Sequence, residues 1–179
     1  LGDVYKRQSP MLMQADFLLS QCELMMASYG NPLMPIEKSL IDRCISLVYR
    51  DYLKNPRPEN MPILGDLYQC LREQHNSRAD DLATAMEIYV TGSLSYLNHR
   101  TNVDLNNRMV CYNISKLGQG LKKLVMSNVQ KHIWQRTAVN RYAGITTRIF
   151  LDEFHLLLKE PQTAAYTAEI YKRFRKWNG

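Results

Sequence analysis

The sequence has 179 residues, of which 45% are hydrophobic and 22% are charged, and it carries a formal net charge of +6 with a pI near 9.2. This length is enough for one ordinary domain, or parts of two, with a buried core. No apolar run approaches the roughly 20 residues that a membrane-spanning helix needs, so we expect a cytoplasmic globular chain.

The charge, the cysteines and the histidines indicate no specific site. A net charge of +6 permits contact with nucleic acid or an anionic membrane surface without requiring either. The cysteines and histidines are widely spaced, so we expect buried reduced thiols rather than a disulfide framework or a zinc site. These residues are Cys22, Cys44, Cys70, Cys111, His75, His99, His132 and His155.

The first eight residues form a segment that we expect to be artificial. Asp3-Val4-Tyr5-Lys6-Arg7-Gln8 resembles a translated sequencing-library adapter, so residues 1–8 are left out of the predicted fold. We therefore expect a natural reading frame that was cut upstream, and a motif missing from the beginning of the chain then carries no weight.

Residues 9–92 show helical periodicity throughout. Apolar stripes with helical spacing alternate with short polar connections, and Pro35, Asn55-Pro56 and Pro62 mark helix boundaries, so the pattern predicts an all-helical bundle. The residues expected to face inward are Phe17, Leu18, Leu24 and Met25, then Ile36, Leu40, Ile41, Cys44, Leu47 and Val48, then Ile63, Leu67, Cys70 and Leu71, and finally Leu82, Ala85, Met86 and Tyr89.

A strand, a long helix and a second strand are predicted after a loop rich in Gly and Asn. Residues 109–114 have the pattern of a short strand, and a helical pattern begins near Lys116. The second strand follows Gly144, which predicts two parallel strands joined by a right-handed crossover. Between strand and helix, residues 118–123 lie where a phosphate-binding loop would lie, but their spacing does not match, so we interpret them as a flexible helix start.

The apolar segment Arg148-Ile149-Phe150-Leu151 ends in two carboxylates, Asp152 and Glu153. Acidic residues at the C-terminal end of a buried parallel strand lie where open α/β sheets bind their ligands. This is the pattern of a Walker B motif, in which Asp152 would hold Mg²⁺ and Glu153 would orient the water that attacks the γ-phosphate of ATP. A structural alternative stays open, because many strands end in acidic residues that cap the next helix.

A last helix is predicted from Pro161, with an inward face of Ala164, Ala168, Tyr171, Phe174 and Trp177. Basic residues near its end complement the helix dipole. A more specific hypothesis makes Arg173 or Arg175 a γ-phosphate sensor or an arginine finger toward a neighbouring subunit.

Residues 98–104, 108–118, 152–160, 162–166 and 171–177 together resemble the conjugative-transfer and type IV secretion ATPases of the VirB-four type. The resemblance implies a mostly helical α/β fold: a RecA-like P-loop NTPase core with an all-α subdomain inserted before the Walker B strand. The implied domains are an adapter-like artefact at 1–8, the inserted subdomain at 9–92 and a partial core at 93–179. ATP and Mg²⁺ are the implied cofactors, with Asp152 on the metal and Glu153 as the catalytic residue.

The resemblance also implies ATP hydrolysis that powers conjugative DNA transfer or type IV secretion. The intact protein would be a cytoplasmic homo-hexamer on the inner face of the membrane, bound to secretion-channel subunits and linked indirectly to the transferred DNA. The chain would be an internal fragment without Walker A, inactive by itself. Two alternatives stay open: a DExH-type helicase fragment, because residues 152–155 fit that box, and a non-enzymatic helical interaction module.

Overall fold

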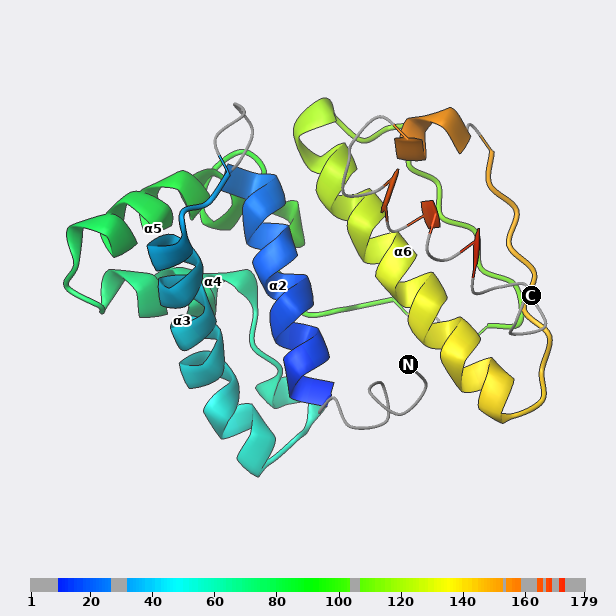
Figure 1. Ribbon diagram of the computed structural model, residues 1–179, viewed down its shortest axis with the longest axis horizontal. Coiled ribbons are helices and arrows are strands. Elements are labelled where there is room, and N and C mark those ends of the chain that lie inside the picture. The colour runs from blue at the N-terminus through cyan, green and yellow to red at the C-terminus, as the bar shows by residue number, and fades with distance from the viewer. Residues whose placement is uncertain are drawn as a thin grey trace. The chain divides into compact units, whose positions relative to one another are not determined.

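The computed structural model of the chain describes residues 10–26, 32–103, 107–152 and 154–158, and residues 164, 165, 167, 168, 171 and 172. The helices are α2 (Pro10–Met26), α3 (Pro35–Lys54), α4 (Leu64–Arg72), α5 (Ser77–Val90) and α6 (Gln119–Tyr142), with short 3₁₀ helices η1 (Pro58–Asn60), η2 (Ser95–Leu97) and η3 (Phe154–Leu158) (Figure 1). The chain divides into two compact units between Arg108 and Met109. None of the described helices combines the length and apolar character that a membrane span requires.

The first unit is a helical bundle, as the periodicity of residues 9–92 predicts. Helix α3 packs against α2, α4 and α5, and α5 also packs against α2 and α4. The buried core includes Cys22 and Met25 of α2, Leu40, Ile41, Cys44 and Ile45 of α3, Leu67 and Leu71 of α4, and Leu82, Ala83 and Met86 of α5. The predicted bundle is therefore confirmed for the described helices.

Helix boundaries in this unit follow from local capping. Helix α3 begins at Pro35, and the Glu37 carboxylate accepts a 2.7 Å hydrogen bond from the backbone N–H of Met34. Helix α4 begins at Leu64 rather than at the predicted Pro62, because the Asp66 carboxylate accepts a 2.8 Å hydrogen bond from the N–H of Ile63, the residue that precedes the helix.

Three predicted inward positions of the bundle are wrong. Ile36 and Leu47 of α3 are 54% and 40% exposed. Helix α3 buries the arc formed by Ile41, Ile45 and Tyr49, and Ile36 and Leu47 lie outside this arc. Ala85 of α5 is exposed as well, because it lies outside the arc formed by Leu82 and Met86.

The second unit is built on α6, and the chain turns back along this helix after it ends (Figure 1). Gly144 makes the turn with φ +68°, and the N–H of Ile145 donates a 2.8 Å hydrogen bond to the Asn140 carbonyl, which is a Schellman C-cap. The Asn140 side-chain amide then donates to the Thr147 hydroxyl at 2.9 Å. Further along, Gln130 donates to the Thr167 hydroxyl at 2.8 Å, and both side chains are buried.

The contact with Thr167 corrects the predicted face of the last helix. Ala168 is exposed and Tyr171 is 80% exposed, whereas Thr167 is only 7% exposed because its hydroxyl pairs with α6. Phe174 and Trp177 lie outside the described residues.

The two predicted strands are not formed: the described part of the chain contains no strand. Residues 109–114 and 148–152 are irregular, and Met109 and Phe150 are 87% and 91% exposed. An extended segment becomes a strand only when a neighbour supplies ladder hydrogen bonds, and no described backbone hydrogen bond joins these two segments. The parallel βαβ prediction is therefore wrong for the described residues, and the structure bears out the helical part of the predicted fold class.

Candidate functional site

Asp152 is the one predicted site residue that the structure describes. It is exposed and lies in a turn between the irregular segment that follows α6 and helix η3. An exposed carboxylate of this kind suits Mg²⁺, which keeps several of its waters when it binds protein oxygens. Among the described residues, no group of three His, Cys, Asp or Glu side chains is placed to hold a metal ion.

The other predicted site residues, Glu153, Arg173 and Arg175, lie outside the described residues. Of the four predicted site residues, the described part of the chain therefore locates Asp152 alone. The predicted Walker B strand would also have buried its apolar side chains, whereas Phe150 and Leu151 are 91% and 46% exposed.

The segment at 118–123 behaves as a helix start, as its spacing predicts. Gly118 precedes α6, and its carbonyl accepts hydrogen bonds from the N–H groups of Leu121 and Lys122, both at 3.1 Å. A Cβ at Gly118 would meet nothing within 4 Å, so no close approach of the backbone requires a glycine there.

Polar and ionisable side chains gather on α6, which the sequence reasoning missed. The Tyr112 hydroxyl shares a hydrogen bond with Nδ1 of His132, and the two rings pack edge to face. Burial, and then the nearby charge of Arg136, lowers the pKa of His132. Burial also lowers the pKa of Lys131 to about 8. One signal in the sequence could have indicated this polar packing. Gln130 and Thr137 are seven residues apart, which places both on the buried face of α6.

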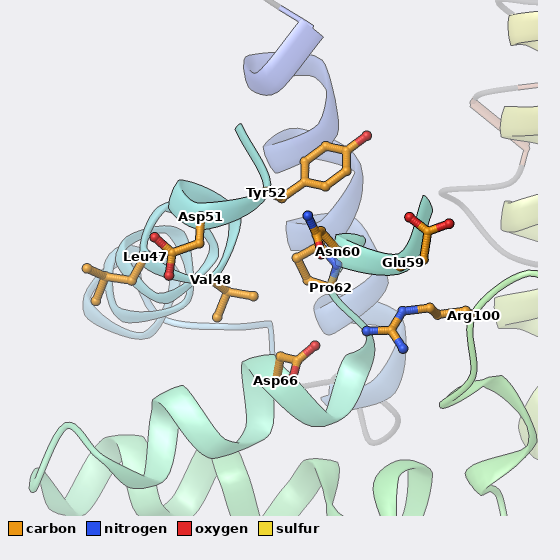
Figure 2. Close-up of a pocket in the computed structure, with 9 residues that line it drawn as sticks. All are labelled: Leu47, Val48, Asp51, Tyr52, Glu59, Asn60, Pro62, Asp66 and Arg100. Carbon is orange, nitrogen blue, oxygen red and sulfur yellow. The ribbon is translucent and has the colours of Figure 1, made fainter. Parts of the chain in front are cut away.

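A pocket of about 470 Å³ lies in the helical unit (Figure 2). Its lining residues are Leu47, Val48, Asp51, Tyr52, Glu59, Asn60, Pro62, Asp66 and Arg100. Figure 2 shows that the carboxylates come from α3, η1 and α4, whereas Arg100 enters from the segment after η2. Asp51 pairs with Lys54 at 2.9 Å, Asp66 caps α4, and Nε of Arg100 donates to the Met61 carbonyl at 3.3 Å. These groups already have structural partners, so the pocket indicates no specific chemistry.

Asn98 joins two helix ends and lies in the segment 98–104. Its Oδ1 accepts a 2.7 Å hydrogen bond from the N–H of Gly65 at the beginning of α4. Its Nδ2 donates a 3.1 Å hydrogen bond to the carbonyl of Val90 at the end of α5. A Cβ on Gly65 would lie 3.3 Å from the Asn98 amide, so the two residues fit closely. Within residues 98–104, one of the segments that carry the family resemblance, Asn98 therefore has a structural role.

Comparison with known proteins places this arrangement in a known fold. No protein-family model and no curated protein sequence matches the chain. The solved structure of VirB4 of Thermoanaerobacter pseudethanolicus matches with a TM-score of 0.78, covering 96% of this chain and 68% of that chain at 20% sequence identity. This chain has the fold of VirB4. Because nearly the whole chain is covered, the VirB4 fold extends over both compact units, and the resemblance read from the sequence is confirmed at the level of fold.

Proposed function

We propose that this chain belongs to an ATPase that powers type IV secretion or conjugative DNA transfer. The observation that supports the proposal best is the likeness to VirB4 over 96% of the chain. The sequence adds an independent reason, because an apolar segment ending in Asp152 and Glu153 is the pattern by which such ATPases hold a metal and a water. On this proposal, residues 9–92 belong to an inserted helical subdomain that the compact unit continues to Arg108, and the rest of the chain is part of a RecA-like core.

In this function Asp152 and Glu153 would have different tasks. The Asp152 carboxylate would bind Mg²⁺ through water, and Mg²⁺ would supply charge neutralisation on the phosphates of ATP. Glu153 would accept a hydrogen bond from the attacking water and orient it toward the γ-phosphorus. Arg173 or Arg175 would stabilise the negative charge that develops during transfer.

The 179 residues contain no Gly-x-x-x-x-Gly-Lys-Ser/Thr sequence, whose backbone N–H groups and Lys cradle the phosphates in this class of enzyme. We therefore propose that the chain alone does not hydrolyse ATP and that turnover requires a protein that joins these residues to such a loop. That protein would form a homo-hexamer on the cytoplasmic face of the membrane. There it would contact secretion-channel subunits, with an indirect link to transferred DNA.

The test compares Glu153→Gln with the parent sequence in a protein that carries both this sequence and a phosphate-binding loop. The amide keeps the size of the side chain but removes the charge that polarises water, so turnover should fall by at least 10²-fold while ATP still binds. Asp66→Asn is the matched control, because Asp66 caps α4 in the helical unit. Hydrolysis that is unchanged in Glu153→Gln refutes the role of Glu153.

A non-enzymatic interaction module is the second candidate, and one observation favours it. Helix η3 begins at Phe154, directly after the acidic pair, which is where carboxylates cap a helix. In that case Glu153→Gln would lower the stability of the joined protein without changing its rate of ATP hydrolysis. Measuring both the stability and the hydrolysis rate of this variant separates the two candidates.

A further inference from the structure

One side of α3 is exposed and combines apolar with basic side chains. The residues on this side are Ile36, Arg43, Leu47, Arg50 and Lys54, and their spacing places them on one stripe of a helix with 3.6 residues per turn. Ile36 and Leu47 are 54% and 40% exposed, Arg43 is exposed, and the side chains of Arg50 and Lys54 are 65% and 69% exposed. We call these five residues the α3 face.

One side of α5 is exposed and carries negative charge. Asp81, Ala85 and Ile88 recur at helical spacing, and Glu87 lies beside them. All four are exposed, and Ile88 keeps 45% of its surface in solvent. Neither carboxylate forms an ion pair with another described residue. We call these four residues the α5 face.

The two faces match in charge and in spacing. Arg43 and Arg50 lie roughly 10 Å apart along the axis of α3, and Asp81 and Glu87 lie roughly 9 Å apart along α5. A contact between the two helices can therefore join two pairs of opposite charges and enclose the apolar Leu47 between them. Within one chain the faces cannot pair, because α3 and α5 pack against each other with their buried sides. A second copy of the chain supplies the complement of each face.

We propose that the α3 face of one copy binds the α5 face of a second copy. This contact is heterologous, so each bound copy keeps one free face of each kind, and repetition of the contact builds a ring when the rotation closes. The ring rests on the proposed function, in which the intact protein is a homo-hexamer. The pairing itself needs no ATP, so it can fail while the proposed ATPase function stands.

The pairing should be weak and sensitive to salt, because exposed ion pairs contribute little each and are screened by ions. The experiment is sedimentation equilibrium of the folded 179-residue chain at increasing protein concentrations and low ionic strength. We expect a weight-average mass that rises above the 20.9 kDa of one chain. The mass should fall back toward this value at an ionic strength of about 0.5 M, where the screening length is well below 10 Å.

Variants that block one face at a time identify the two surfaces. Arg43→Gln/Leu47→Gln blocks the α3 face, and Asp81→Asn/Ile88→Gln blocks the α5 face. Each blocked variant alone lacks one of the two complementary faces, so its apparent dissociation constant should rise by at least about tenfold. An equimolar mixture should form pairs that stop at two chains, because each variant supplies the face that the other lacks.

Two control variants remove the same charges elsewhere on the helical unit. Arg57→Gln and Asp16→Asn alter exposed side chains outside both faces and should associate as the parent does. Every substituted side chain is exposed, so circular dichroism should show a melting midpoint close to that of the parent for all variants.

The proposal is overturned if the parent keeps the mass of one chain at every concentration, or if the blocked variants associate as well as the parent. It is equally overturned if the mixture of blocked variants fails to pair. An anionic membrane is the other partner that a basic and apolar face fits. If the parent binds phosphatidylglycerol vesicles, Arg43→Gln/Leu47→Gln does not, and the copies do not associate, the α3 face belongs to a lipid surface and the pairing is refuted.

Discussion

Asn98 offers the sharpest test of how the helical unit holds together. In Asn98→Ala, the N–H of Gly65 and the carbonyl of Val90 both lose their partner. A typical intramolecular hydrogen bond contributes about 1 kcal/mol, so two of them predict a loss of about 2 kcal/mol in the free energy of unfolding. For a helical unit of about 100 residues, that loss corresponds to a melting midpoint lower by ~10 °C.

The assay is urea or thermal unfolding followed by circular dichroism, with two comparison variants. Asn98→Asp keeps the acceptor for Gly65 and loses the donor for Val90, so it should cost about half as much as the alanine variant. Asn102→Ala removes an exposed amide of the same loop and should leave the midpoint unchanged. Equal midpoints for Asn98→Ala and Asn102→Ala would refute the bridging role of Asn98.

Three further outcomes follow from single residues. Ile41→Ala should lower the free energy of unfolding by about 2–5 kcal/mol because Ile41 is fully buried, whereas Ile36→Ala on the same helix should lower it by less than about 1 kcal/mol. Equal losses of stability in equilibrium unfolding would contradict the burial of Ile41 and the exposure of Ile36. Gly144→Ala should lower the free energy of unfolding by about 1 kcal/mol because Gly144 has a positive φ, and Gly144→Asn should lower it less because Asn tolerates this conformation. If calorimetry finds Gly144→Asn to be the less stable variant, the Schellman cap is contradicted. Burial lowers the pKa of Lys131 from 10.5 to about 8, so between these pH values the unfolded chain binds one more proton than the folded chain, and the free energy of unfolding rises with pH. Lys131→Met should therefore stabilise the chain most below pH 8 and not at all near pH 10.5. A stability difference that does not depend on pH would contradict the burial of Lys131.

Local signals in the sequence predicted the helical unit well. Pro35 and the Asn55-Pro56 pair mark both ends of α3 as the structure has them, because proline and capping act within a few residues. The start of α4 was predicted too early, since the capping carboxylate of Asp66 determines where that helix begins. Ile36 and Leu47 were misjudged because the apolar stripe in the sequence is wider than the arc of α3 that the neighbouring helices cover.

Features that depend on distant parts of the chain could not be predicted in this way. The strands expected at 109–114 and 148–152 have the right composition, but pairing depends on hydrogen bonds from another segment. Of the candidate site, the exposed position of Asp152 is described, and the roles of Asp152 and Glu153 stay predictions.

The double attachment of Asn98 sets a practical limit on how short a soluble version of the helical unit can be made. Asn98 and Arg100 follow α5 in the sequence yet hold the beginning of α4 and the Met61 carbonyl. A version that stops at residue 92 would lose the hydrogen bonds of Asn98 and Arg100. The beginning of α4 and the end of α5 would then be open to fraying and to proteases. A version that continues to Arg108 would keep them, and it is the sensible starting point for expressing the bundle by itself.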